Sequence, residues 1–309
     1  MSGNRTSHLI ERAVEQMAQR RAHPSAPIPP ASRAPVAGDD WGCAGDVPQD
    51  QVMPDAPPPV SSRAAPDPIT VATLEAAGLA VAGPRRTRIS DEWRVASGQL
   101  LSRLRAAPAR DGCAANLLMV TSSKPDEGKS FCALNLACSL TLGGLTEVVL
   151  MDVDSKPVSL SALLGLAEHP GLFDLVADPS LRPEDLVLPT AIAGLSILPI
   201  GRAVDADGGN SVGRTVTRPV AVMVEKLARH FSNKVVVLDA APSLATSDVS
   251  SLAPSVGQIV MIVEAERTQH EDLEAALELL RPCPNITLVL NKVRFATKHA
   301  FGHSHYFDT

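Results

Sequence analysis

The fold is decided by the stretch Val120-Thr-Ser-Ser-Lys-Pro-Asp-Glu-Gly-Lys-Ser130. It follows the apolar run 116–121 and opens a helical pattern, 129–142, that is apolar on nearly every side. A loop between a buried strand and a helix is where phosphate-binding loops occur, because its amides and the helix N-terminus can point at phosphate oxygens. Lys129 can then reach the terminal phosphates, and the Ser130 hydroxyl can ligate Mg²⁺. The stretch therefore predicts a phosphate site, although Ser123 replaces the first glycine of G-x-x-x-x-G-K-[ST].

Two further apolar runs end in carboxylates. Asp152 and Asp154 leave the run 147–151, and Asp239 follows the run 234–238. Because alternate residues of a strand share a face, Asp152 and Asp154 can point toward one site. Ligands of open α/β sheets bind beyond the carboxyl ends of the strands, so the loop and the three carboxylates are expected at one edge. Together these elements predict a nucleoside triphosphate site.

Apolar runs alternate with helical segments from residue 116 onward. The runs suited to buried strands are 116–121, 147–151, 195–200, 234–238, 258–263 and 287–290. Helical periodicity marks 129–142, 220–231 and 273–280. Such repetition predicts an α/β fold, a doubly wound, mostly parallel sheet of the P-loop NTPase type. Two earlier helices are expected at 70–78 and 90–104, with Ser90 as the N-cap of the second.

Composition excludes several classes of protein. The 309 residues include 28 Lys and Arg against 34 Asp and Glu, a net charge of −6, which argues against a protein that coats nucleic acid. Nine aromatic residues make base-stacking platforms unlikely candidates and favour a core of Val, Leu, Ile and Ala. The five cysteines are scattered without a C-x-x-C pair, as expected in a reducing compartment. With no secretory signal and no apolar run near the ~18 residues of a membrane span, the chain is expected to be cytoplasmic.

The N-terminal part has a different composition from the rest. Twelve of the 26 prolines lie between Pro24 and Pro68, which predicts a disordered Pro/Ala-rich linker at 23–69. Before it, residues 1–22 contain an apolar stripe at helical spacing: Leu9, Ile10, Ala13, Val14 and Met17. This helix is either a frayed terminus or a docking helix for a partner. The expected domains are thus 1–22, 23–69, a P-loop domain at 70–294, and a flexible tail at 295–309.

The loop 123–130, the Asp-x-Asp of Asp152 and Asp154, and the strand ending at Asp239 with Pro242 occur together. On these features the chain resembles the bacterial tyrosine kinases, P-loop proteins of capsular and exopolysaccharide polymerisation and export. It looks most like the exosortase-associated tyrosine autokinase subgroup. The segments that carry this likeness are Leu9-Ile-Glu-Arg-Ala13, Leu74-Glu-Ala-Ala-Gly78, Asp152-Val-Asp-Ser-Lys-Pro157, Pro170-Gly-Leu-Phe-Asp-Leu-Val-Ala-Asp178, Leu195-Ser-Ile-Leu-Pro-Ile-Gly201 and Leu290-Asn-Lys292.

The resemblance implies an ATP-dependent, Mg²⁺-dependent protein-tyrosine autokinase that regulates exopolysaccharide biosynthesis and export. Lys129 would position the transferred phosphate, and Asp154 would accept the proton of the attacking tyrosine. Mg²⁺ would be held by Ser130, Asp152 and Asp239. ATP would lie on the loop and the first helical turn, formed by Pro125, Asp126, Glu127, Gly128, Lys129, Ser130 and Phe131.

The resemblance also implies partners. Members of the family phosphorylate a tyrosine-rich C-terminal tail on a neighbouring subunit of a ring, and a membrane co-polymerase activates them. The implied partner here is an inner-membrane polysaccharide co-polymerase, or chain-length determinant protein, bound through the N-terminal helix. The chain would therefore be peripheral to the inner membrane, with a homo-oligomer possible and no nucleic acid bound.

The sequence departs from the family pattern in its tail and in its ring-forming motif. The tail contains one tyrosine, Tyr306, which would be the phosphoacceptor. The family's Glu-x-x-Arg-x-x-Arg motif is represented by Asp91, Arg94 and Ser97, and residues 202–214 are rich in Asp and Gly. These departures put ring assembly and multi-site autophosphorylation in doubt.

Two other functions therefore stay open. The first is a non-catalytic ATP-binding regulator of the polysaccharide export complex, which the lone tyrosine favours. The second is a partitioning-type P-loop ATPase, in which Lys124 would reach across a dimer. At the far end of the domain, Asn291 and Lys292 could contact the nucleotide base or could simply form a turn.

Overall fold

The computed structural model describes residues 66–82, 87–106, 113–142, 146–202 and 218–293. The expected docking helix at 1–22, most of the linker, and the tail with Tyr306 lie outside these described residues. Ile69 is the first described residue that packs into the fold: it is buried and forms an isolated parallel bridge with Thr190.

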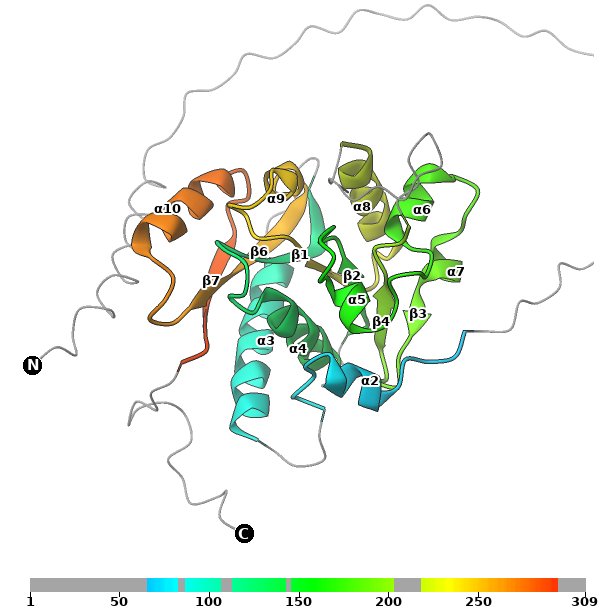
Figure 1. The fold of residues 1–309 in the computed structure, drawn as a ribbon, viewed down its shortest axis with the longest axis horizontal. Helices are drawn as coiled ribbons and strands as arrows, with labels where there is room; N and C mark the ends of the chain where they lie inside the picture. Colours follow the sequence, from blue (N-terminus) through cyan, green and yellow to red (C-terminus); the bar gives the residue numbers. More distant parts are fainter. Residues whose placement is uncertain (1–65, 83–86, 107–112, 143–145, 203–217, 294–309) are drawn as a thin grey trace, which may run out of the picture. The chain divides into compact units, whose positions relative to one another are not determined.

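The described residues form a seven-stranded sheet in the order β3-β4-β2-β5-β1-β6-β7 (Figure 1). Its strands are β1 Ala114–Ser122, β2 Val148–Asp152, β3 Leu188–Pro189, β4 Leu195–Leu198, β5 Val235–Asp239, β6 Val256–Glu264 and β7 Ile286–Asn291. Every strand pairs in parallel with its neighbours except β3, which is antiparallel to β4. The mostly parallel sheet expected from the alternating pattern is confirmed.

Helices cover both faces of this sheet, as a doubly wound fold requires. They are α2 Val71–Ala76, α3 Arg88–Ala106, α4 Lys129–Thr141, α5 Leu160–Leu163, α6 Leu172–Ala177, α7 Pro183–Leu186, α8 Arg218–His230, α9 Asp248–Leu252 and α10 His270–Leu279. Buried residues of α2 to α5 pack on one face of the strands, and those of α6 to α10 pack on the other.

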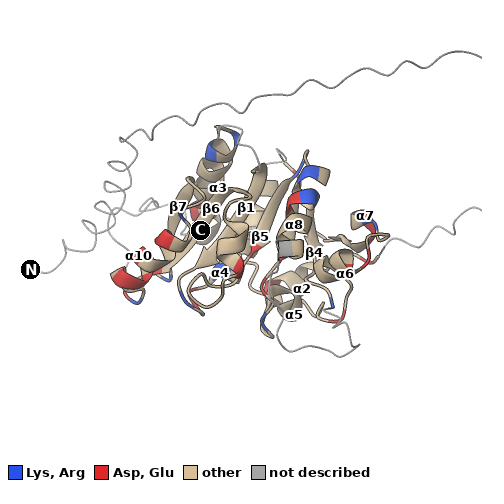
Figure 2. Cartoon of the chain, turned by 90° about the horizontal axis from the view of Figure 1, so that it is seen from above, with Lys and Arg blue, Asp and Glu red and all other residues tan. Residues whose placement is uncertain are grey.

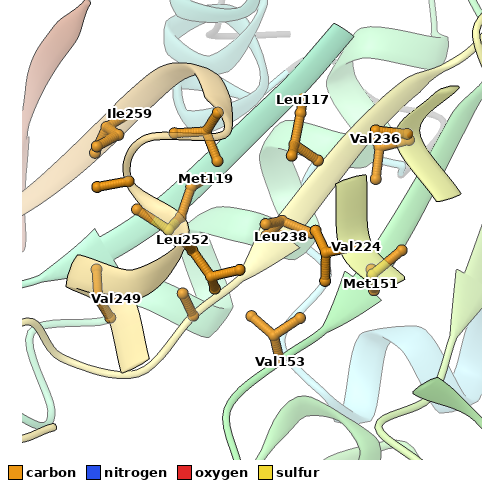
Figure 3. Packing of buried hydrophobic residues seen from close by; sticks show 14 of the residues in the cluster. Leu117, Met119, Met151, Val153, Val224, Val236, Leu238, Val249, Leu252 and Ile259 are labelled. Carbon is orange, nitrogen blue, oxygen red and sulfur yellow. The ribbon is translucent and has the colours of Figure 1, made fainter. Parts of the chain in front are cut away.

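Alternation along β1 shows how two cores are built from one strand. Leu117 and Met119 belong to the core under α8 and α9 (Figure 3), whereas Leu118 and Val120 belong to the core under α3 and α4. Successive side chains of a strand point to opposite faces, so a strand buried on both sides is apolar at every position. This explains why the central strands read as continuous apolar runs.

Two local predictions differ from the structure. Ser90 is not the N-cap of α3, because the helix begins at Arg88 and the Thr87 hydroxyl accepts a hydrogen bond from the Ser90 amide at 3.2 Å. Thr87 thus takes the capping position three residues before Ser90. The sequence analysis also missed β3, whose two residues include a proline and are too few to show a pattern.

Acidic residues are prominent on the outer helix α10, where Glu271, Glu274 and Glu278 are exposed (Figure 2). Among the helices that the structure describes, none is both long and apolar enough to cross a bilayer.

Candidate nucleotide-binding site

The phosphate loop joins β1 to α4 and ends in a helix N-terminus without a side-chain cap. Gly128, the N-cap of α4, has φ 93°, a left-handed conformation that favours glycine. In this turn the Cys132 amide donates a hydrogen bond to the Gly128 carbonyl at 2.9 Å. The first amides of a helix have no partner within the helix, so this terminus is suited to bind an anion.

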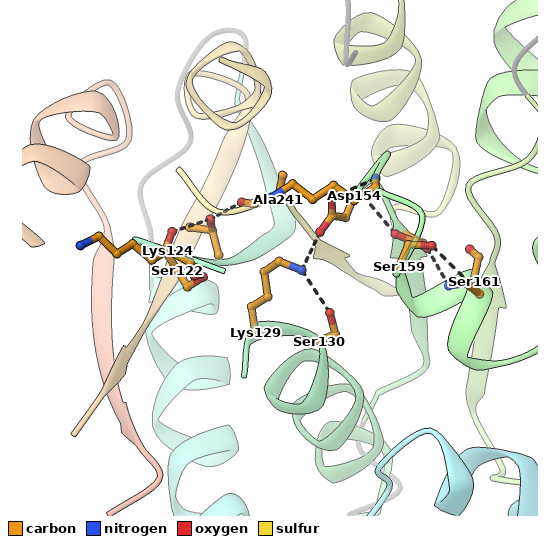
Figure 4. Close-up of polar contacts among 12 residues, drawn as sticks. Ser122, Lys124, Lys129, Ser130, Asp154, Ser159, Ser161 and Ala241 are labelled. Carbon is orange, nitrogen blue, oxygen red and sulfur yellow. Dashed lines mark hydrogen bonds and ion pairs between the residues drawn. The ribbon is translucent and has the colours of Figure 1, made fainter. Parts of the chain in front are cut away.

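Lys129 is the cation of the site. Its ammonium lies 2.6 Å from Asp154 Oδ2 and 3.2 Å from the Ser130 hydroxyl (Figure 4). Burial by itself lowers the pKa of Lys129, but the carboxylates of Asp239, Asp154 and Asp152 outweigh this effect and raise it. Lys129 is therefore held protonated beside three carboxylates.

Asp152 organises the chain that leaves β2. Its two oxygens accept hydrogen bonds from the Asp154 amide at 3.0 Å and from the Ser161 amide at 2.7 Å. Burial raises the pKa of Asp152, and the hydrogen bonds from Ser161 and Asp154 oppose this change. Ser161 is fixed in turn, because its hydroxyl accepts from the Ile200 amide at 3.0 Å. Asp152 thus positions Asp154 as well as contributing its own charge.

Asp239 is paired in register with Asp152 on the adjacent strand, and its side chain is fully buried. Among the described residues, neither of its oxygens has a hydrogen bond of ordinary geometry. The pKa of Asp239 is raised to about 7, mainly by burial and also by the carboxylates of Asp152 and Asp154, whereas Lys129 and Ser130 oppose the rise. A buried carboxyl without a partner is costly, so a cation is the expected companion of this side chain.

Ser130, Asp152 and Asp239 fit a magnesium ion that is shared with a nucleotide. In the part of the chain that the structure describes, no three His, Cys, Asp or Glu side chains form a ready-made metal cluster. Mg²⁺ is usually bound through one or two carboxylates together with phosphate oxygens and water, so this donor set is suitable. The unpartnered Asp239 and the uncapped α4 terminus thus agree with a Mg²⁺–nucleotide complex.

The seven residues expected to hold ATP, 125–131, differ in what their backbone and side chains contact. The backbone of 125–130 forms the loop, with Asp126 at φ 66° and Gly128 at φ 93°. The Glu127 side chain is buried and accepts from the Lys124 amide, so it serves the loop itself rather than facing outward. Phe131 lies in the first turn of α4, and its ring faces Gly78 of the segment after α2.

The other residues singled out from the sequence have partners within this chain. Lys124 pairs with Asp272 of α10 at 2.5 Å. Asn291 donates to the Glu127 carbonyl, and Lys292 to the Asp126 carbonyl, so both hold the phosphate loop.

Sequence reasoning missed Ser161, Thr268 and the role of Glu127. A serine-rich stretch after Pro157 is the one local signal for Ser161, whereas Thr268 lies far from the loop in sequence.

Comparisons with known proteins bear on this site. No protein-family profile matches the chain. The chain is 29% identical over 167 residues to the putative tyrosine-protein kinase EpsB of Ralstonia nicotianae, an alignment that covers 54% of this chain and 21% of the relative. It is 27% identical over 157 residues to the succinoglycan biosynthesis transport protein ExoP of Rhizobium meliloti, covering 51% and 19%.

A solved structure shows the same fold. The kinase domain of the Escherichia coli tyrosine kinase ETK superimposes with a TM-score of 0.51 at 20% identity, covering 68% of this chain and 80% of that domain. The resemblance to bacterial tyrosine kinases and the fold inferred from the sequence are therefore confirmed. The chain spans about a fifth of the length of the two relatives named above. The likeness to the exosortase-associated subgroup stays a prediction.

Proposed function

We propose that this chain is an ATP-dependent protein-tyrosine kinase that acts in exopolysaccharide biosynthesis and export. The observation that carries the proposal is the buried edge where Lys129, Asp154 and the unpartnered Asp239 meet the uncapped N-terminus of α4. The relatives named for tyrosine kinase activity and for succinoglycan biosynthesis transport support the substrate class and the process.

The residues of the site have separate tasks in phosphoryl transfer. The amides at the start of α4 bind phosphate oxygens, and Lys129 neutralises their charge. Ser130, Asp152 and Asp239 would hold Mg²⁺, which supplies positive charge on the phosphates when bound. Transfer of this kind depends mainly on positioning and charge stabilisation, so these few groups suffice.

Asp154 is the group that would take the proton. In the structure its carboxylate is paired with Lys129. When ATP binds, its phosphates would offer Lys129 alternative partners. When Lys129 turns to a phosphate, Asp154 becomes available to a tyrosine hydroxyl. Asp154 accepts the phenolic proton as the tyrosine oxygen bonds to the γ-phosphorus and ADP leaves. Tyr306 is the proposed acceptor, because it is the one tyrosine of the sequence.

The proposed partner is an inner-membrane polysaccharide co-polymerase that binds the N-terminal helix. This would place the chain in the cytoplasm, peripheral to the membrane. Support comes from the amphipathic stripe at 9–17 and from the likeness to the succinoglycan biosynthesis transport protein ExoP.

A non-catalytic ATP-binding regulator is the second candidate function, and the single tyrosine favours it. The partitioning-type ATPase is weaker, since the Lys124 that would have to cross a dimer pairs with Asp272 of its own chain.

The test is incubation of the purified chain with Mg-ATP, with and without the cytoplasmic segment of the partner. Phosphotyrosine is measured by mass spectrometry, and released phosphate is measured in parallel. We expect phosphotyrosine at Tyr306, and we expect Lys129→Met to reduce its formation by about 10²–10³-fold, as for other charge-stabilising groups.

Tyr306→Phe is the matched control, since it removes the acceptor and leaves the nucleotide site intact. It should abolish phosphotyrosine on the chain while nucleotide binding persists. Nucleotide binding without phosphotyrosine under either condition would sink the kinase proposal in favour of the regulator. Steady phosphate release without transfer would favour the ATPase.

A further inference from the structure

Three side chains from outside the phosphate loop hold it from the side of β6 and β7. Thr268 Oγ1 donates to Glu127 Oε1 at 2.5 Å. Asn291 Nδ2 donates to the Glu127 carbonyl at 2.9 Å, and Lys292 Nζ donates to the Asp126 carbonyl at 2.5 Å. We call Thr268, Asn291 and Lys292 the loop clamp.

Glu127 connects the loop clamp to the loop's own backbone. Its side chain is only 4% exposed, and its second oxygen, Oε2, accepts from the Lys124 amide at 3.0 Å. One carboxylate therefore closes the loop on itself and ties it to the turn that follows β6.

The Thr268 hydroxyl is oriented toward Glu127. Thr268 Oγ1 accepts from the Glu264 amide at 2.9 Å. A hydroxyl has one proton, so with Glu264 as its donor its own proton is directed to Glu127. This contact therefore links the turn directly to the loop.

The loop depends on such external contacts because its sequence does not favour its conformation. Ser123, Pro125 and Asp126 stand where phosphate loops commonly use glycine, and Asp126 adopts a positive φ of 66°. Left-handed conformations cost free energy in residues with a Cβ. Gly128 is also confined, because a Cβ there would lie 2.2 Å from Asn291 Nδ2.

We propose that Thr268 is a positioning residue for the phosphate loop, which acts through Glu127 and sets nucleotide affinity. The proposal rests on the proposed function only in taking a nucleotide as the ligand of the loop. Without the Thr268 hydroxyl, Glu127 loses its tie to the turn, and the loop samples conformations that do not bind phosphate. Binding then costs the free energy of reordering the loop.

The experiment compares Thr268→Val, which keeps the shape but loses the hydroxyl, with Thr268→Ser, which keeps the hydroxyl. The Kd of a fluorescent ADP is measured in the full chain with Mg²⁺. We expect Thr268→Val to weaken binding about tenfold and Thr268→Ser to stay within about twofold of the unchanged chain. Hydrogen exchange of residues 121–131 without nucleotide should be faster in Thr268→Val alone. Equal affinity of Thr268→Val and the unchanged chain, or an equal loss in both variants, would overturn the proposal.

A second pair of variants separates positioning from general electrostatics. Lys292→Met and Arg267→Met each remove one positive charge, but Arg267 is exposed and its guanidinium pairs with Glu264 at 3.6 Å rather than with the phosphate loop. We expect a clear loss of affinity in Lys292→Met and little change in Arg267→Met, whereas equal losses would contradict the loop clamp. These measurements need no phosphoryl transfer. A chain that forms no phosphotyrosine but shows the Thr268 effect would refute the kinase proposal and support the loop clamp.

Discussion

Asp239 ends β5 with its side chain fully buried and with neither oxygen in an ordinary hydrogen bond to the described residues. Burial raises the pKa of this carboxyl to about 7. Its pKa in the unfolded chain is near the ordinary value, so between pH ~4 and ~7 the folded state binds more protons than the unfolded state. By linkage, stability contributed by the protonated group is present at low pH and is lost as pH rises through about 7.

The first prediction follows for the chain in EDTA. Its Tm should fall between pH 5.5 and pH 8 relative to the Tm of Asp239→Asn, which has no carboxyl to ionise. At pH 8 we expect Asp239→Asn to be the more stable protein by about 1–3 kcal/mol, because a buried unpaired charge is removed. Thermal unfolding monitored by circular dichroism measures this difference. Parallel Tm curves for the two proteins would show that Asp239 does not titrate in this range.

The common location of the candidate site residues was predictable where short motifs carry them. Lys129 and Ser130 follow the loop glycine, and Asp152, Asp154 and Asp239 end apolar strands, so local pattern and a general rule of α/β sheets sufficed. The roles of Glu127 and Thr268 were not predictable. They are 141 positions apart and meet because β6 lies beside β1, which no local pattern reveals.

At the scale of elements, α4 shows how a helix that is apolar on nearly all sides accommodates a polar residue. Asn135 is fully buried, yet its amide donates to the carbonyls of Gly78 and Phe131, and its oxygen accepts from the Ala80 amide at 2.8 Å. The segment after α2 has no helical partners for these groups. Asn135 therefore attaches that segment to the core.

Asn135→Leu should destabilise the fold more than loss of a single hydrogen bond does. It leaves the Gly78 carbonyl and the Ala80 amide without their partner, and each buried unpaired group costs about 1–3 kcal/mol. We expect a loss of about 2–4 kcal/mol in urea unfolding, with new proteolytic cleavage inside 66–82. The control is Ser139→Ala, which removes one bond between α4 and Ser97 of α3. Equal effects of the two changes would argue against attachment by Asn135.

The long elements followed from periodicity, whereas most of the short helices did not. Six strands and the helices α2, α3, α4, α8 and α10 were predicted to within a few residues, because burial on one or two faces imposes a repeating pattern. The helices α5, α6, α7 and α9 have four to six residues each, which is too few turns to show one. The N-cap of α3 was misplaced because Thr87 and Ser90 are both capping residues and only packing decides between them.

At the scale of the whole molecule, strand order creates the site. β5 lies between β2 and β1, so Asp152, Asp239 and the phosphate loop reach the same edge as direct neighbours. The order of these strands along the chain does not show this adjacency. The general rule for parallel sheets predicted that these residues share one edge. Because β5 lies beside β2, the carboxyl groups of Asp152 and Asp239 are brought close together.

Lys292 has a consequence for the kinetics of the proposed reaction, because it holds the phosphate loop and also precedes Tyr306, the proposed acceptor, by fourteen residues. A chain of that length spans at most about 50 Å. For the flexible tail that the sequence predicts, a short tether gives an effective concentration in the millimolar range. A tyrosine of the same molecule would then outcompete a tyrosine of a neighbour at micromolar protein.

We therefore expect phosphotyrosine to form with first-order kinetics, at a rate per molecule that does not change on dilution from about 10 µM to about 0.1 µM. A mixture of Lys129→Met, which keeps the acceptor, and Tyr306→Phe, which keeps the site, should form little product at these concentrations. A rate per molecule that rises in proportion to concentration would instead mark transfer between neighbours. If the chain is the proposed kinase, the position of Lys292 beside the phosphate loop would thus decide whether transfer occurs within one molecule or between two.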